Sequence, residues 1–279
     1  MNLEEKIKND IYKSVLKSSI SLEDNYIDFI KSKINNSQIS KERFFLRKII
    51  ENSKIAECKE WPLCQDTGFL TFYIKLPKWF QNGYLLKNII DNSLIKLWKD
   101  KGFRNSVIGN NGVNTDNNLP AKYYFDFSNE DKLDISYIIK GGGSENVSLL
   151  LTLIPNIEED EFVEKVSCEI LNKANSKACP PYFIGIGKGG SVESSSINAR
   201  KALIDIDFKN MNNIESKICE KLNLSNIGLF GTKYGDTVFF VKIIEDFSHI
   251  ANNIVSIAIN CHSLRRGKVI YTREYNENS

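Results

Sequence analysis

Residues 61–68, Trp-Pro-Leu-Cys-Gln-Asp-Thr-Gly, and the run Phe-Leu-Thr-Phe-Tyr-Ile at 69–74 mark the point where the pattern of the chain changes. Before residue 61, apolar residues recur at helical spacing. The proline and the glycine of 61–68 interrupt that spacing, and the apolar run that follows is typical of a buried strand. Residues 61–68 are therefore predicted to form a loop between a helix and a strand.

The rest of the sequence extends this pattern of helices and strands in both directions. Before the loop, the periodicity predicts helices at Leu3–Ser19, Leu22–Ile34 and from Ser40 to about Cys58. After it, we expect helices at about 85–99, 158–174, 192–203 and 214–222, strands at 135–139, 147–154, 238–244, 254–260 and 269–272, and irregular structure at 105–119. The sequence thus predicts an α+β fold in one domain, residues 1–279, with a helical N-terminal portion over 1–60 and a mixed sheet packed by helices.

Composition excludes several classes of protein. The 279 residues include 37 Lys plus Arg and 35 Asp plus Glu, for a formal charge of +2, so no nucleic-acid groove is indicated and an anionic partner should be small. We find neither a signal peptide nor an apolar run of membrane-spanning length. Six cysteines are too few for a disulfide scaffold in a chain of this size. We therefore expect a cytoplasmic protein that does not enter membranes.

Three of the six cysteines have a setting in which they could bind a metal. Cys64, Cys179 and Cys261 lie in turns beside proline, glycine or polar residues, whereas the other three fall within predicted helices. Their spacing is too wide for a local zinc knuckle. If they converge in space, three thiolates suit a soft metal or an iron–sulfur cluster with one open iron. The alternative is that all six are buried or surface thiols without a chemical role.

Five motifs in a fixed order give the sequence a family resemblance. They are residues 64–68 (Cys-Gln-Asp-Thr-Gly), 140–146 (Lys-Gly-Gly-Gly-Ser-Glu-Asn), 178–181 (Ala-Cys-Pro-Pro), 185–190 and 260–266. Together they resemble class I fumarases, and more specifically the α subunit of the two-subunit iron–sulfur hydro-lyases, the fumarase and L-tartrate dehydratase group, or the N-terminal half of the fused form. The resemblance covers about residue 55 to the C-terminus. It implies a 4Fe-4S cluster held by Cys64, Cys179 and Cys261, and the reversible hydration of a small dicarboxylic acid, with fumarate/malate first and tartrate second.

The resemblance also implies roles for individual residues. Asp66 is expected to be the acid that handles the proton travelling with the substrate oxygen, and Gln65 to bind substrate. Arg104 lies where the family has a substrate-binding arginine, and the N–H groups of Gly142 and Gly143 can approach a carboxylate. Each has a plainer alternative: Asp66 can stabilise an Asx-type turn, the glycine run can be a simple strand-to-strand turn, and Arg104 can be an ordinary surface residue.

Other residues leave their roles open. Gly185, Gly187 and Gly190 are predicted to lie in a loop after a strand, and they fit the G-x-G-x-x-G spacing of a dinucleotide site. We see no matching acidic residue after a second strand, so we discount that site. The residue after Cys261, His262, can contact the cluster or substrate or be structural. Arg265 and Arg266 can face an anionic cluster or form a basic subunit-contact surface.

The family's catalytic base and several substrate-binding basic residues lie on a second domain or β subunit. The resemblance therefore implies that this chain alone is inactive, and that it works in an oligomer with a β subunit. Two other functions stay open: a non-enzymatic iron–sulfur sensor or degenerate subunit, which would keep the cysteines but lose substrate contacts, and nucleotide binding by the glycine loops. Loss of turnover in Asp66→Asn with the cluster spectrum retained would favour the hydro-lyase.

Overall fold

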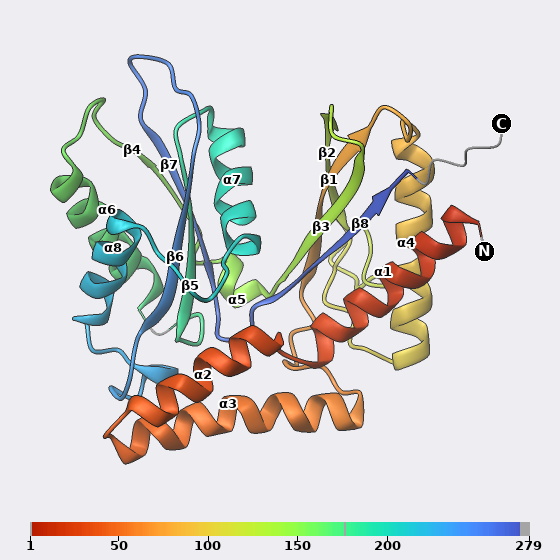
Figure 1. Ribbon diagram of the computed structural model, residues 1–279. Helices are drawn as coiled ribbons and strands as arrows, with labels where there is room; N and C mark the ends of the chain where they lie inside the picture. Colours follow the sequence, from red (N-terminus) through yellow and green to blue (C-terminus); the bar gives the residue numbers. More distant parts are fainter. Residues whose placement is uncertain (1, 176, 274–279) are drawn as a thin grey trace. The chain divides into compact units, whose positions relative to one another are not determined.

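The computed structural model describes residues 2–175 and 177–273 (Figure 1). The described chain forms two compact units, each built from separate stretches: unit 1 comprises residues 2–21, 56–140 and 265–273, and unit 2 comprises residues 22–55 and 141–264. The predicted α+β class, with a helical N-terminal portion and mixed β structure packed by helices, is confirmed, although two mixed sheets are present where one was expected. The strands of the described chain form two sheets, one in each unit. That residues 1–279 make one domain stays a prediction.

Unit 1 contains a four-stranded mixed sheet in the order β2-β1-β3-β8. The strands are β1 (Phe69–Pro77), β2 (Lys122–Ser128), β3 (Lys132–Lys140) and β8 (Arg265–Thr272). β1 runs parallel to β2 and antiparallel to β3, which is antiparallel to β8. β1, which follows the loop at residues 61–68, and β8 therefore belong to one sheet although they are distant in sequence.

Helices α1 (Leu3–Ile20) and α4 (Gly83–Lys101) pack together and form the core of unit 1 with its sheet (Figure 1). The core side of α1 carries Ile7, Ile11 and Val15, each fully buried, at the spacing that aligns residues on one helix face. The N-terminal N–H groups of α1 and α4 are capped by Asn2 and Asn82, whose side chains accept hydrogen bonds at 2.9 Å.

Unit 2 has its own four-stranded mixed sheet in the order β4-β7-β5-β6. Its strands are β4 (Leu149–Thr152), β5 (Tyr182–Lys188), β6 (Val238–Glu245) and β7 (Ile254–Asn260), and its helices are α2 (Asp24–Asn36), α5 (Gly142–Glu145), α6 (Glu159–Ala174), α7 (Val192–Ile204), α8 (Asn213–Asn223), the short η1 (Leu229–Gly231) and most of α3 (Ser40–Lys59). Helices α6 and α8 share a hydrophobic core with the sheet. The opposite side of β5 packs against α7.

Gly185 and Gly187 lie inside β5, whereas the sequence placed them in a loop after a strand. A Cβ at either position would lie 2.0 Å from a carbonyl oxygen of α7, that of Ala199 or of Ser195. The absence of side chains lets the helix backbone lie directly on the strand. This close packing explains both glycines.

Two further segments, β2 and residues 141–143, also differ from the sequence expectation. β2 forms an edge strand that we did not assign, although its alternation of aromatic and polar residues is typical of a strand. The glycine run at 141–143 was expected to be a turn or an anion site between strands. Its last two residues begin the four-residue helix α5, with Gly141 as the N-cap residue, so the run is not a simple turn, and the anion site stays a prediction.

Candidate active site

The loop of residues 64–68 lies in unit 1 immediately before β1, and its conformation is fixed at Gly68. This residue has a φ of +82°, and a Cβ there would lie 2.8 Å from Ile139 Cγ2 and 2.9 Å from the Lys140 carbonyl oxygen. Both the backbone conformation and the space therefore require glycine. Asp66 Oδ1 accepts a hydrogen bond from the Gly68 N–H at 3.0 Å. The Asx-type turn that we considered for Asp66 is thus present, and it uses one of the two carboxylate oxygens.

The loop presents its predicted functional side chains at or near the surface. Gln65 is exposed, and Cys64 and Asp66 are half-buried. The preceding residue, Leu63, is buried and donates its N–H to the Ser19 carbonyl oxygen of α1 at 2.8 Å. The loop is therefore anchored at both ends while its middle remains accessible.

Arg104 belongs to a segment that is hydrogen-bonded to this loop. The Thr67 hydroxyl donates to the Arg104 carbonyl oxygen at 2.6 Å and shares a 2.8 Å hydrogen bond with the Ser106 hydroxyl. The Trp98 indole N–H donates to the same carbonyl at 3.3 Å. The backbone of Arg104 is thus held while its side chain is exposed, so unit 1 brings together the segments that carry Gln65, Asp66 and Arg104.

Arg265, whose role the sequence left open, is a buried contact of the same loop. Its side chain is 2% exposed, and its guanidinium donates to the Asp66 carbonyl oxygen at 2.8 Å. In the described part of the chain, Arg265 Nε has no hydrogen-bond partner. Arg266 is also buried, at 8% exposed. Their burial argues against an exposed basic contact surface for these two residues.

Unit 2 brings Cys179 and Cys261 into one neighbourhood. The backbone N–H of His262 donates to the Cys179 carbonyl oxygen at 3.4 Å, and His262 Nδ1 is also 3.4 Å from that oxygen. The N–H of Cys261 donates to the Ser144 hydroxyl at 3.3 Å. Cys179 is exposed and Cys261 is half-buried. Three segments distant in sequence, those around residues 144, 179 and 261, are therefore linked here.

Two buried tyrosines support this neighbourhood. The Tyr26 hydroxyl of α2 donates to the His262 carbonyl oxygen at 3.0 Å, and its ring packs against Phe183 and Phe208. Burial raises the pKa of Tyr26 well above its usual value, and the negative charge of the Cys261 thiolate adds to this effect. Burial also raises the pKa of Tyr182 to about 12, with further contributions from both Cys179 and Cys261. Both cysteines thus lie within electrostatic reach of one hydroxyl.

Gly142 and Gly143 are exposed in the first turn of α5, whose Ser144 contacts the Cys261 backbone. A Cβ at Gly143 would have one neighbour, the Lys177 carbonyl oxygen at 3.7 Å, an ordinary contact distance. Packing therefore does not require glycine at position 143.

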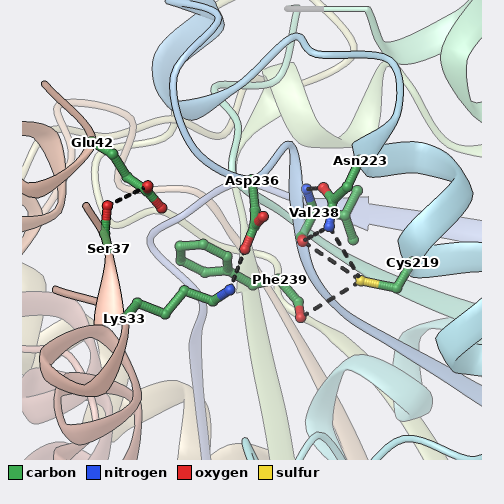
Figure 2. A network of polar contacts seen from close by, with 8 residues as sticks. All are labelled: Lys33, Ser37, Glu42, Cys219, Asn223, Asp236, Val238 and Phe239. Carbon is green, nitrogen blue, oxygen red and sulfur yellow. Dashed lines mark hydrogen bonds and ion pairs between the residues drawn. The ribbon is translucent and has the colours of Figure 1, made fainter. Parts of the chain in front are cut away.

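The other three cysteines have surroundings unlike those of a metal ligand. Cys58 and Cys168 lie exposed on helices. Cys219 is buried in α8, and Figure 2 shows its sulfur facing the Val238 and Phe239 carbonyl oxygens, at 3.6 and 3.9 Å. Burial raises the pKa of the Cys219 thiol to about 12, which disfavours the thiolate that metals require.

The predicted site residues thus fall into two groups. Cys64, Gln65, Asp66 and Arg104 belong to unit 1, and Gly142, Gly143, Cys179 and Cys261 to unit 2. Within the described ranges, no three or more His, Cys, Asp or Glu side chains are grouped so as to hold a metal ion. The donor chemistry of Cys64, Cys179 and Cys261 nevertheless fits an iron–sulfur cluster, because all three are free thiols with some exposure.

A family model described as fumarate hydratase (Fumerase) matches residues 8–270. The chain belongs to this family. The match extends the resemblance, which the motifs placed from about residue 55 onward, into the first helix of this fumarase-family chain.

Several relatives match most of the chain. One is a Methanocaldococcus jannaschii protein provisionally named L(+)-tartrate dehydratase subunit alpha, 34% identical over 84% of this chain and 86% of the relative. A Geobacillus stearothermophilus protein provisionally named class I fumarate hydratase is 29% identical over 94% of this chain and 54% of its own length. The L(+)-tartrate dehydratase subunit alpha of Escherichia coli (strain K12) is 25% identical over 90% of this chain and 86% of its own.

Membership of the fumarase family confirms the predicted enzyme class, a carbon–oxygen hydro-lyase of the class I fumarase and L-tartrate dehydratase group. Among the described helices, none combines the length and the apolar character that a membrane span requires.

Sequence reasoning missed two residues around the loop at 64–68: it left the role of Arg265 open, and it gave none to Asn118, a buried residue of the irregular stretch.

Proposed function

We propose that this fumarase-family chain is the α subunit of a 4Fe-4S-dependent hydro-lyase that reversibly adds water to, or removes it from, a small dicarboxylic 2-hydroxy acid. The family match over residues 8–270 is the observation that carries the proposal. Fumarate/malate is the first substrate, since the family model is described as fumarate hydratase. L-Tartrate is the second, supported by the names of two relatives.

Cys64 of unit 1 and Cys179 and Cys261 of unit 2 are the proposed cluster ligands. When bound through three cysteines, such a cluster supplies one Lewis-acidic iron that can polarise a substrate hydroxyl. We expect Cys64→Ser, Cys179→Ser and Cys261→Ser each to reduce the iron bound after anaerobic reconstitution. Cys58→Ser and Cys168→Ser are matched controls and should bind as much iron as the wild type. Equal iron in all five variants would contradict this ligand set.

The chain's own residues bind substrate and move a proton. Asp66 is the proposed general acid, with its carboxylate oriented by the Gly68 N–H and its backbone held by Arg265. The Arg104 guanidinium suits a substrate carboxylate because it offers paired donors, and the Gln65 amide adds a further polar contact. The N–H groups of Gly142 and Gly143 are proposed to contact a carboxylate, since packing gives no reason for glycine at position 143.

A β subunit is proposed as the partner that supplies the remaining catalytic groups, and the assembly as an oligomer. Two relatives are themselves named alpha subunits, and the chain matches 54% of the length of the class I fumarate hydratase relative. We also propose a reducing, cytoplasmic location, because all six cysteines are free thiols. Enzymatic hydration of fumarate by the reconstituted chain alone would contradict the need for a partner.

Asp66→Asn tests the proposed function in the reconstituted complex. Turnover of fumarate or L-tartrate should fall by about 10²–10⁴-fold, the usual contribution of a general acid, while cluster absorbance is retained. Asp126→Asn is a matched control, because Asp126 is an exposed residue of unit 1 outside the proposed site. Absence of turnover in the wild-type complex with a normal cluster spectrum would instead favour the iron–sulfur sensor.

A further inference from the structure

Asn118 is a buried polar residue that no role described above uses. It lies in the irregular stretch between α4 and β2, its side chain is 2% exposed, and its φ is +58°. Its amide makes three hydrogen bonds: Nδ2 donates to the Gly68 carbonyl oxygen at 3.1 Å, and Oδ1 accepts from the N–H groups of Ser106 at 2.7 Å and Val107 at 3.2 Å. One side chain therefore satisfies three backbone groups on two segments.

The two segments are those that carry proposed site residues of unit 1. Gly68 ends the loop whose Asp66 carboxylate accepts the Gly68 N–H, so a shift of Gly68 moves that carboxylate. Ser106 and Val107 lie two and three residues after Arg104, so their hydrogen bonds to Asn118 fix the path of the backbone that follows the arginine. Thr67 makes a parallel connection through its bond to the Arg104 carbonyl oxygen. Asn118 thus links the same two segments as Thr67 does, through a separate set of hydrogen bonds.

The position of Asn118 needs a side chain that both donates and accepts hydrogen bonds, which a carboxamide does. It has a donor and an acceptor on one planar group, whereas a carboxylate keeps the acceptor and loses the donor. Asparagine and glycine are also the residues that best tolerate a φ near +58°. Breaking the buried bonds to Gly68 and Val107 leaves backbone groups without partners, which is costly where those groups are buried.

We propose that Asn118 is a positioning residue, which holds the loop bearing Asp66 in register with the segment bearing Arg104. This inference rests on the proposed function, because it takes its meaning from the roles of those two residues. Asn118 itself contacts backbone groups and acts through their neighbours.

Two substitutions distinguish the bond of Asn118 to Gly68 from its bonds to Ser106 and Val107. Asn118→Asp keeps the acceptor for Ser106 and Val107 but loses the donor to Gly68, so Asp66 should be misplaced and Arg104 should not. We expect kcat of the reconstituted complex to fall about tenfold or more with KM nearly unchanged. Asn118→Gly preserves the backbone conformation and loses all three bonds, so kcat should fall and KM should also rise.

Hydrogen exchange of the full chain gives a readout that does not depend on turnover. Asn118→Asp should speed amide exchange in peptides over residues 64–70 and leave residues 104–108 as in the wild type, whereas Asn118→Gly should speed both. Asn111→Asp makes the same charge change on an exposed side chain of the same stretch and should alter neither exchange nor kinetics. If the buried carboxylate prevents folding, Thr67→Val removes the parallel bond and should raise KM.

Wild-type exchange at 64–70 in Asn118→Asp, or identical changes of kcat and KM in the two Asn118 variants, would overturn the inference. Full activity of Asp66→Asn would overturn the proposed function instead. In that case the exchange data would still show whether Asn118 holds the two segments together.

Discussion

Gly187→Ala should loosen the packing of α7 on β5 and destabilise unit 2. The new Cβ would lie 2.0 Å from the Ser195 carbonyl oxygen, whereas real Cβ contacts are essentially never closer than 3.0 Å, so the helix must retreat by about 1 Å. Ser195 would move with it, although its hydroxyl donates to the Gly187 carbonyl oxygen at 2.7 Å and accepts the Ser256 N–H at 2.9 Å.

The loss of stability in Gly187→Ala is the sum of two destabilising effects and one stabilising effect. Overpacking a well-packed region costs about 1–3 kcal/mol, and weakening the Ser195 hydrogen bonds adds about 1 kcal/mol. Replacing glycine by alanine returns about 0.4–1 kcal/mol through the unfolded chain. We therefore expect the free energy of unfolding to fall by about 1–3.5 kcal/mol, and Tm to fall by about 2–14 °C.

Thermal and urea unfolding followed by circular dichroism measure this change. Gly143→Ala is the matched control, since its Cβ would meet one atom at 3.7 Å, and its stability should stay within about 0.5 kcal/mol of the wild type. The same control should raise KM if the Gly143 N–H binds a substrate carboxylate. A Gly187→Ala protein whose Tm is within about 1 °C of the wild type would refute the packing argument.

Three further outcomes follow from buried polar groups. The Cys219 thiol keeps its proton up to a pKa of about 12 in the folded chain, against 9.0 ordinarily, so its stabilising effect is complete below pH 9 and is lost as pH rises toward 12. In urea unfolding, Cys219→Ala should therefore lose stability less steeply over that range, by up to about 1.4 kcal/mol per pH unit; equal slopes would contradict this. Arg265→Met should leave Tm nearly unchanged, because the lost bond to Asp66 is offset by removal of the unpaired Nε, yet speed amide exchange at residues 66–70; wild-type exchange there would show that Arg265 does not hold the loop. Tyr26→Phe should reduce the free energy of unfolding by about 1 kcal/mol through loss of the bond to His262, and an unchanged value would argue against that bond.

Helix positions were predictable from the sequence because they depend on local periodicity. The structure has helices at Leu3–Ile20, Ser40–Lys59 and Val192–Ile204, each within a few residues of its expected range. Gly185 and Gly187 were misplaced for a different reason. A glycine inside a strand looks like a loop signal because the close approach of helix α7 that requires it is a tertiary contact, which the local sequence pattern does not report.

The candidate site was predictable only where the motifs are local. The local motifs identified the segments of Cys179 and Cys261, which lie close together in unit 2, whereas the binding of a cluster by these cysteines and Cys64 stays a prediction. Asn118 could not be found, because its three hydrogen bonds depend on tertiary contacts across 11 to 50 residues, which periodicity does not report. The expected irregularity of residues 105–119 was largely right, but such a stretch can still hold a fixed polar contact.

During synthesis on the ribosome, the sheet of unit 1 can be completed only near the end of translation. Its strand β8 spans Arg265–Thr272 and pairs with β3, which is translated more than a hundred residues earlier. Until β8 emerges, β3 has β1 on one side and an unpaired edge on the other. All the residues of unit 2 have by then been made. The nascent chain must therefore keep an apolar strand from aggregating while its partner is translated, and a chain stopped short of residue 265 would carry that exposed edge permanently.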